Sequence, residues 1–237
     1  MPEWIVAISF ISYLLGSIPF SYIVAKSYGK NLHKEGSGNV GAMNVWRSTR
    51  KFWPLFSAFT GDVGKGSIAM AIATIFSNWH NASPLLTTWA LAFACAFVVI
   101  GHNWPIWLNF KGGKGLACLL GVVLFLNLGA GFAALGVIIA AIFLTEFVMT
   151  SMEFKKSIPR KAGAKGFFKK AFSVLGAQVL GRVIGIALTP AMMWFFFGQR
   201  VFWIALAGVV IALFKHMPRL NRYLRDLTKD FSAADIN

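Results

Sequence analysis

The sequence predicts an all-α, polytopic membrane protein with about seven transmembrane helices. Hydrophobic residues make up 57% of the 237 residues and charged residues only 13%, and the mean hydropathy of +0.65 is well above that of a soluble globular domain. The apolar residues form repeated runs of roughly 15–22 residues, the length with which a helix crosses a hydrocarbon core of about 30 Å. They do not alternate with polar residues, as strands of a membrane barrel would. We therefore expect one integral membrane domain over residues 1–237.

The expected helices follow the apolar runs in chain order: about residues 4–25, 53–77, 85–101, 116–148, 183–197 and 201–214. The fourth of these runs is long enough for two helices, which the polar break Asn127-Leu128-Gly129 would separate. The first half of that run is the shortest expected span. A re-entrant segment there, and hence six spans, is the alternative.

The positions of the basic residues, which give the chain a net charge of +15, indicate its orientation in the membrane. Of the 23 Lys and Arg residues, 21 fall in alternate connections or in the C-terminal tail, and the exceptions are Lys65 and Arg200. Such connections face the cytoplasm, so the N-terminus is expected outside and the C-terminus in the cytoplasm. The longest basic stretches are a cytoplasmic insertion at about 150–182 and a cytoplasmic tail at 215–237, where contact with anionic membrane lipid is expected. No nucleic-acid partner is needed to explain this charge.

A polar, glycine-rich stretch at residues 36–47, GSGNVGAMNVWR, separates the first two apolar runs. Glycines let consecutive backbone N–H groups turn towards one point, and an arginine offers a planar fork for phosphate or carboxylate. We expect an anion-binding loop, and an ordinary connecting loop made of turn-forming residues is the alternative. The candidate ligand-binding residues are Ser37, Gly38, Asn39, Gly41, Asn44 and Arg47.

A pair of opposite charges, Asp62 and Lys65, lies inside the second apolar run. Because they are three residues apart, a helix places them on one face, where they neutralise each other. Ionisable residues within a membrane span are functional by default, and a structural ion pair that fixes helix packing is the alternative.

The third polar stretch, GHNWPIWLNFKGGKG at residues 101–115, ends where the fourth helix is expected to begin. Backbone N–H groups at a helix N-terminus attract phosphate, so we expect a phosphate site here. It is not a Walker A loop, because Leu108 stands where its first glycine is required. Clustered carboxylates are absent from the stretch, so no metal ion or other cofactor is expected. The candidates are His102, Asn103, Lys111, Gly112, Gly113, Lys114 and Gly115, and a capping or interfacial role is the alternative for His102.

Taken together, SGNVGAMNVWR at 37–47, DVGKG at 62–66 and the stretch at 101–115 resemble the PlsY family of bacterial membrane acyltransferases, in order and spacing, over roughly residues 10–118. The resemblance implies transfer of an acyl chain from acyl phosphate to glycerol 3-phosphate, which gives lysophosphatidic acid for phospholipid biosynthesis. It also implies a site on the cytoplasmic side of the bacterial inner membrane. A soluble enzyme that produces acyl phosphate is a candidate partner.

The same resemblance implies residue roles. Ser37 and Arg47 would contact the phosphates and the reacting centre, with His102 and Lys111 as further catalytic residues. The donor's own phosphate would take the proton from the attacking hydroxyl, so that catalysis rests on orientation and charge stabilisation. The implied substrate-binding residues are Gly38, Asn39, Gly41, Asn44, Asp62, Lys65, Asn103, Gly112, Gly113, Lys114, Gly115 and His216.

The second half of the chain departs from the family pattern. Thr145 to Met149 stand where an Arg-Tyr-Val-Ser-like run is expected, Arg219 replaces an Asn, and a closing Gly-x-Glu is missing. A transporter or channel for a phosphorylated solute is the alternative function, since it would also use glycine-broken helices and charges near the midplane. An inactive scaffold is a third hypothesis.

Overall fold

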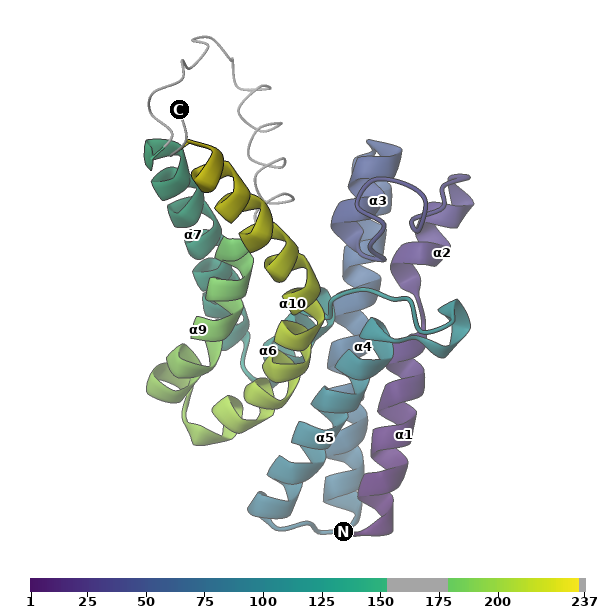
Figure 1. Ribbon diagram of the computed structural model, residues 1–237. Helices are drawn as coiled ribbons and strands as arrows, with labels where there is room; N and C mark the ends of the chain where they lie inside the picture. The colour runs from purple at the N-terminus through teal and green to yellow at the C-terminus, as the bar shows by residue number, and fades with distance from the viewer. Residues whose placement is uncertain (153–178, 235–237) are drawn as a thin grey trace. The chain divides into compact units, whose positions relative to one another are not determined.

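A computed structural model describes residues 1–152 and 179–234 of the chain, with side chains at 1–147 and 179–225, and these ranges are helical with short connections (Figure 1). The prediction of an all-α fold is confirmed. A short 3₁₀ turn covers Ile106–Leu108. The α-helices are α1 Glu3–Ser17, α2 Phe20–Ser27, α3 Ala42–Thr49, α4 Phe52–Trp79, α5 Pro84–Asn103, α6 Leu116–Leu126, α7 Leu128–Met152, α9 Leu180–Phe197 and α10 Gln199–Ala234.

Five helical segments of the described chain are long and apolar enough to cross a membrane. They are Glu3–Ser27, Pro84–Leu108, Leu128–Phe147, Leu180–Phe197 and Gln199–Arg225. Helix α6 is apolar but only 11 residues long, and the 28-residue helix α4 carries Asp62 and Lys65. The chain is an integral membrane protein, while seven spans and an outside N-terminus stay predictions.

The first predicted helix, at 4–25, is in fact two. Helix α1 ends at Ser17, Ile18 is extended, and α2 begins at Phe20. The cause is Pro19, which lacks a backbone N–H and disfavours the helical conformation of the residue before it.

Two other boundaries differ from the prediction. Residues 42–47 of the expected anion-binding loop form most of helix α3, which begins after the extended Gly41. Helix α10 continues past residue 214 into the basic tail and ends at Ala234. The break at Asn127 is confirmed, because its side-chain oxygen accepts a hydrogen bond from the Ala130 N–H and so caps α7. The predicted insertion at about 150–182 lies for the most part outside the described residues.

The chain divides into two compact units, residues 1–134 with 190–215 and residues 135–189 with 216–237. The predicted single domain stays a prediction. In the second unit, α9 packs closely on α7, since a methyl group added at Gly185 would meet the backbone of Ile138. The three polar motifs lie in the first unit.

Helices α1, α4, α5 and α6 pack against one another in the first unit (Figure 1), and glycines let them approach closely. A side chain at Gly16 of α1 would strike the Val98 carbonyl of α5, and one at Gly101 of α5 would strike the Tyr13 carbonyl of α1. Helices α4 and α6 make the same reciprocal contact through Gly66 and Gly121. Small residues allow backbones to approach in this way in membrane proteins. The result is that α4 holds the motif at 62–66, and α5 and α6 hold the two ends of the motif at 101–115, in fixed positions.

Candidate active site

The loop before α3 is held together by one buried amide, that of Asn44. Its Oδ1 accepts a hydrogen bond from the Ser37 N–H at 2.8 Å, and its Nδ2 donates to the carbonyls of Leu32 and Glu35 at 3.2 and 3.0 Å. Gly36 lies so close that a methyl group there would overlap Asn44 Oδ1. The described contacts use both polar atoms of Asn44 to shape the loop, and its predicted ligand-binding role stays a prediction.

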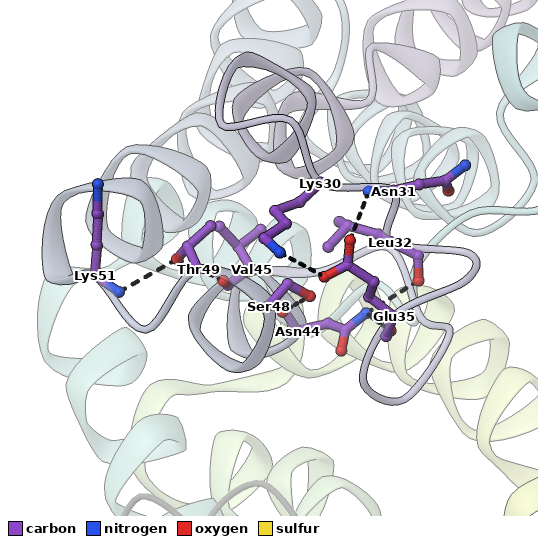
Figure 2. A network of polar contacts seen from close by, with 9 residues as sticks. All are labelled: Lys30, Asn31, Leu32, Glu35, Asn44, Val45, Ser48, Thr49 and Lys51. Atoms are coloured by element: carbon purple, nitrogen blue, oxygen red, sulfur yellow. Dashed lines mark hydrogen bonds and ion pairs between the residues drawn. The ribbon is translucent and has the colours of Figure 1, made fainter.

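A second set of bonds ties this loop to the end of α2 (Figure 2). The Lys30 ammonium lies 3.4 Å from the Glu35 carboxylate, and that carboxylate accepts a hydrogen bond from the Asn31 N–H at 3.3 Å. Arg47 Nη1 donates a hydrogen bond to Ser37 Oγ at 3.4 Å, and Ser37 is exposed. The predicted pair of Ser37 and Arg47 is therefore brought together at the surface of the first unit.

The first unit also contains a buried network, which is formed by Ser21, Asp62, Lys65 and His102. Asp62 Oδ1 lies 2.9 Å from Lys65 Nζ and 3.4 Å from His102 Nδ1, while Oδ2 accepts a hydrogen bond from Ser21 Oγ at 2.6 Å. Asp62 and Lys65 are each 1% exposed and His102 is 7% exposed. The predicted neutralisation of Asp62 by Lys65 is confirmed, and three helices contribute to it.

The helix break at Pro19 completes the buried network. Lys65 Nζ donates to the Ile18 carbonyl at 3.0 Å. A buried ammonium needs such partners, because an unpaired charge in an apolar environment is very costly. The Ile18 carbonyl thus accepts a second hydrogen bond from the Lys65 ammonium, in addition to the ion pair with Asp62.

The glycine-rich loop at 111–115 folds back over His102. The N–H groups of Gly112 and Gly113 donate to the carbonyls of Asn103 and His102 at 3.2 and 3.0 Å, so these two groups hold the loop in place. A methyl group at Gly113 would strike both His102 Nε2 and the carbonyl of Val40. This close packing brings residues from the loop at 36–41, the end of α5 and the loop at 111–115 to one point.

Gly115 and Asn103 mark the start of α6. Gly115 has a φ of 82°, a left-handed conformation that favours glycine, and it is the N-cap of the helix. The Asn103 side chain beside it is fully buried, and neither of its amide atoms has a hydrogen-bond partner in the described chain. Buried amides are usually hydrogen-bonded, so these two atoms are available to a substrate group or to an ordered water, and the predicted binding role of Asn103 stays a prediction.

Lys215, which lies on α10 and is half-buried, was not predicted from the sequence as part of the site. Its Nζ donates to the Asn103 carbonyl at 2.8 Å and lies 4.5 Å from the centre of the Trp104 ring, a cation–π contact. Ser21 and the Ile18 carbonyl were also missed. Pro19 was the available signal for the carbonyl, because a proline inside an apolar run breaks the helix.

The remaining predicted residues are placed as follows. Lys111 is exposed, Lys114 is partly buried in the same loop, and Gly38, Asn39 and Gly41 lie in the loop before α3. His216 belongs to the second unit, and its proposed role at the site stays a prediction. No cluster of three or more His, Cys, Asp or Glu side chains that suits a metal ion occurs among the described residues.

With this geometry in view, comparison with known proteins is informative. The family model described as "Glycerol-3-phosphate acyltransferase" matches residues 6–155, more than half of the chain. The chain belongs to the glycerol-3-phosphate acyltransferase family. The matched residues include all three polar motifs, so the resemblance inferred from them is confirmed.

Relatives of the same name cover most of the chain. A glycerol-3-phosphate acyltransferase of Prochlorococcus marinus (strain MIT 9215) is 32% identical over 225 residues, which are 93% of this chain and 94% of the relative. One of Synechococcus elongatus is 37% identical over 145 residues, 61% of this chain and 69% of the relative.

The fold agrees with a solved member of the family. The crystal structure of PlsY (YgiH), an integral membrane glycerol 3-phosphate acyltransferase, in the glycerol 3-phosphate form, matches with a TM-score of 0.66 and 26% identity. The alignment covers 94% of this chain and 92% of that chain. The lysophosphatidic acid form of PlsY matches with a TM-score of 0.65.

Proposed function

We propose that this chain transfers an acyl chain from acyl phosphate to glycerol 3-phosphate and releases lysophosphatidic acid and phosphate. Family membership supports acyl transfer to glycerol 3-phosphate, as do the glycerol 3-phosphate and lysophosphatidic acid forms of PlsY. The observation that carries the proposal for this chain is the packing of Gly113 against both His102 and Val40, which joins the two glycine-rich loops over one buried network.

The reaction needs two anionic substrates side by side. Arg47 and Ser37 on one loop, and Lys111 and Lys114 on the other, supply counter-charge and hydrogen-bond donors for their phosphates. A hydroxyl of glycerol 3-phosphate attacks the carbonyl carbon of the donor. A new ester C–O bond forms, the C–O bond to phosphate breaks, and the phosphate leaves with the proton of the hydroxyl.

In this scheme the protein contributes position and charge. Bound substrates held in a reactive geometry gain much of the rate that a bimolecular reaction loses to entropy. Cationic side chains near the departing phosphate stabilise the charge that develops there. We further propose a site on the cytoplasmic side of the bacterial inner membrane, because connections rich in Lys and Arg, which carry these motifs, usually face the cytoplasm. A soluble enzyme that produces acyl phosphate is the proposed partner, because the reaction consumes that donor.

Lysophosphatidic acid formation by the purified protein tests the proposal. Labelled glycerol 3-phosphate is incubated with palmitoyl phosphate, with palmitoyl-CoA or without a donor. Lysophosphatidic acid is expected with palmitoyl phosphate and not with palmitoyl-CoA or without a donor. Counterflow of labelled glycerol 3-phosphate in proteoliposomes without a donor, and no product with either donor, would instead support the transporter.

Single variants test the residue roles. Lys111→Ala is expected to raise the KM for glycerol 3-phosphate, and Arg47→Ala to lower kcat, each by about tenfold or more, as for the loss of one charge-assisted contact. Lys26→Ala is the matched control, because Lys26 is an exposed lysine on α2 outside the motifs. Wild-type kinetics in both site variants would refute the assignment of these two residues.

A further inference from the structure

The C-terminal end of helix α5 anchors the glycine-rich loop at 111–115. Asn103 is the last residue of α5, and the carbonyls in the last turn of a helix have no partner within that helix. Two of them, the carbonyls of His102 and Asn103, accept the N–H groups of Gly113 and Gly112 at 3.0 and 3.2 Å. A methyl group at Gly112 would also strike the His102 carbonyl. The loop and the end of α5 are therefore packed as one piece.

Helix α10 holds the same helix end through Lys215. Its Nζ donates to the Asn103 carbonyl at 2.8 Å, so one oxygen atom accepts both the ammonium and the Gly112 N–H, and the contact with the ammonium is the shorter. A cation at the C-terminal end of a helix is also favoured by the helix dipole. The ammonium lies 4.5 Å from the centre of the Trp104 ring, and the ring of the neighbouring Phe214 lies 6.3 Å from the Trp104 ring, centre to centre. Lys215 thus caps α5 and contacts the residue that follows it.

Helix α1 fixes the next carbonyl along the chain. Tyr13 Oη donates to the Trp104 carbonyl at 3.1 Å. The Trp104 backbone has a φ of −134° and a ψ of 66°, so the chain has left the helical conformation at this residue. The carbonyls of residues 102–104 accept hydrogen bonds from Gly113, Gly112, Lys215 and Tyr13, and of these four donors Lys215 alone carries a charge.

Lys215 differs from the basic tail with which the sequence groups it. It is the first residue of the stretch at 215–237, where contact with anionic lipid is expected. A lysine with that role alone extends its ammonium into water or among lipid headgroups. Lys215 is instead half-buried, and its ammonium contacts a backbone carbonyl and an aromatic ring. Within the described part of the chain it forms no ion pair with a carboxylate.

We propose that Lys215 is a positioning residue: by capping α5, it holds the loop at 111–115 in the conformation that binds the phosphate of glycerol 3-phosphate. The inference rests on the proposed function for the identity of that ligand. A hydrogen bond from a charged donor is stronger than one from a neutral donor. Without the ammonium, the end of α5 frays and the loop loosens with it.

Amide hydrogen exchange of the purified protein in detergent, without substrates, tests this role directly. In Lys215→Met the amides of the loop at 111–115 are expected to exchange at least about tenfold faster than in the wild type, as for the loss of a hydrogen bond to a charged group. Lys215→Arg is expected to keep slow exchange, since arginine is also a charged donor that packs on aromatic rings. Lys26→Met makes the same change at an exposed lysine of α2 and is the control. Wild-type exchange of the loop in Lys215→Met would overturn the proposal.

The kinetics of lysophosphatidic acid formation separate positioning from general damage. Lys215→Met is expected to raise the KM for glycerol 3-phosphate about tenfold and to leave the KM for palmitoyl phosphate unchanged, because the loop at 111–115 is proposed to bind the acceptor. Lys215→Arg is expected to restore the lower KM. A wild-type KM for glycerol 3-phosphate in Lys215→Met, or an equal rise in both KM values, would overturn the proposal. If the wild type formed no lysophosphatidic acid, the proposed function would fail, and the exchange experiment would still decide whether Lys215 holds the loop.

A double variant distinguishes an action through the end of α5 from a direct contact with substrate. Trp104→Leu removes the ring that the ammonium contacts. If Lys215 acts through the end of α5, the effects of Trp104→Leu and Lys215→Met on the KM for glycerol 3-phosphate are less than additive, because residues in one network are coupled. Additive effects would show that Lys215 acts independently of Trp104 and would overturn the proposal.

Discussion

The buried network and the loops above it show opposite designs within one candidate site. In the network, Asp62 and Lys65 are 1% exposed and are joined by close contacts between helices. In the loops, Ser37 and Lys111 are exposed, and the backbone is fixed by Asn44 and by the carbonyls of His102 and Asn103. The comparison shows that the exposed side chains suited to contact substrate lie in loops whose backbone is fixed by buried residues. Damage to the network should cost stability, and damage to the loops should cost activity.

The largest expected effect comes from removing Asp62. Asp62→Ala leaves the Lys65 ammonium buried without its counter-ion, which typically costs roughly 3–5 kcal/mol of unfolding free energy. Unfolding of the purified protein by denaturant in detergent measures it. The double variant Asp62→Ala/Lys65→Met is expected to be more stable than the single variant, because it removes the unpaired charge. A single variant as stable as Lys111→Ala would contradict the contrast between network and loops.

A smaller effect, this time on activity, is expected at the contact between the two loops. Gly113→Ala forces a methyl group against His102 and Val40, and a displacement of about 1 Å in a catalytic site can cost on the order of 10²-fold in rate. Lysophosphatidic acid formation under saturating substrates measures kcat. If Gly113→Ala kept the wild-type kcat, the loops would not need their close contact.

Removing one neutral partner of the carboxylate should matter less. Ser21→Ala deletes the hydrogen bond from Ser21 Oγ to Asp62, and a hydrogen bond to a charged group contributes about 1.5 kcal/mol or somewhat more. Denaturant unfolding again gives the value. Ser27→Ala is the matched control, since the Ser27 hydroxyl is exposed and bonds only within its own helix. Equal unfolding free energies of the two variants would show that the hydrogen bond from Ser21 to Asp62 does not stabilise the protein.

The smallest effect is a gain. Gly64 lies on α4 between Asp62 and Lys65, and an added methyl group there meets nothing within 4 Å. Gly64→Ala is expected to stabilise the helix by about 0.5–1 kcal/mol, because glycine loses more backbone freedom on folding than alanine. A lower unfolding free energy in this variant would show that α4 requires flexibility at Gly64.

Contacts between residues close in sequence could be predicted from the sequence, and contacts between distant residues could not. Helix positions and the pairing of Asp62 with Lys65 were predictable, because hydropathy and a spacing of three residues are local signals. The contacts of Ser21 with Asp62 and of Lys215 with Asn103 join residues 41 and 112 positions apart, and no local pattern encodes them. Residues 42–47 were predicted as part of a loop, because the glycines and asparagines of this stretch are typical of turns. They form most of helix α3 instead, with Asn44 and Val45 buried.

The three-residue spacing of Asp62 and Lys65 also bears on how the protein is made. Charged residues entering a bilayer one at a time are costly, and a lone aspartate or lysine in α4 would oppose insertion. Since both residues stand on one helical face and lie 2.9 Å apart, their charges cancel within α4 itself, before α5 is synthesised. If α4 crosses the membrane as the sequence predicts, it does so with this pair of charges already balanced, and neither charge needs His102 for its neutralisation.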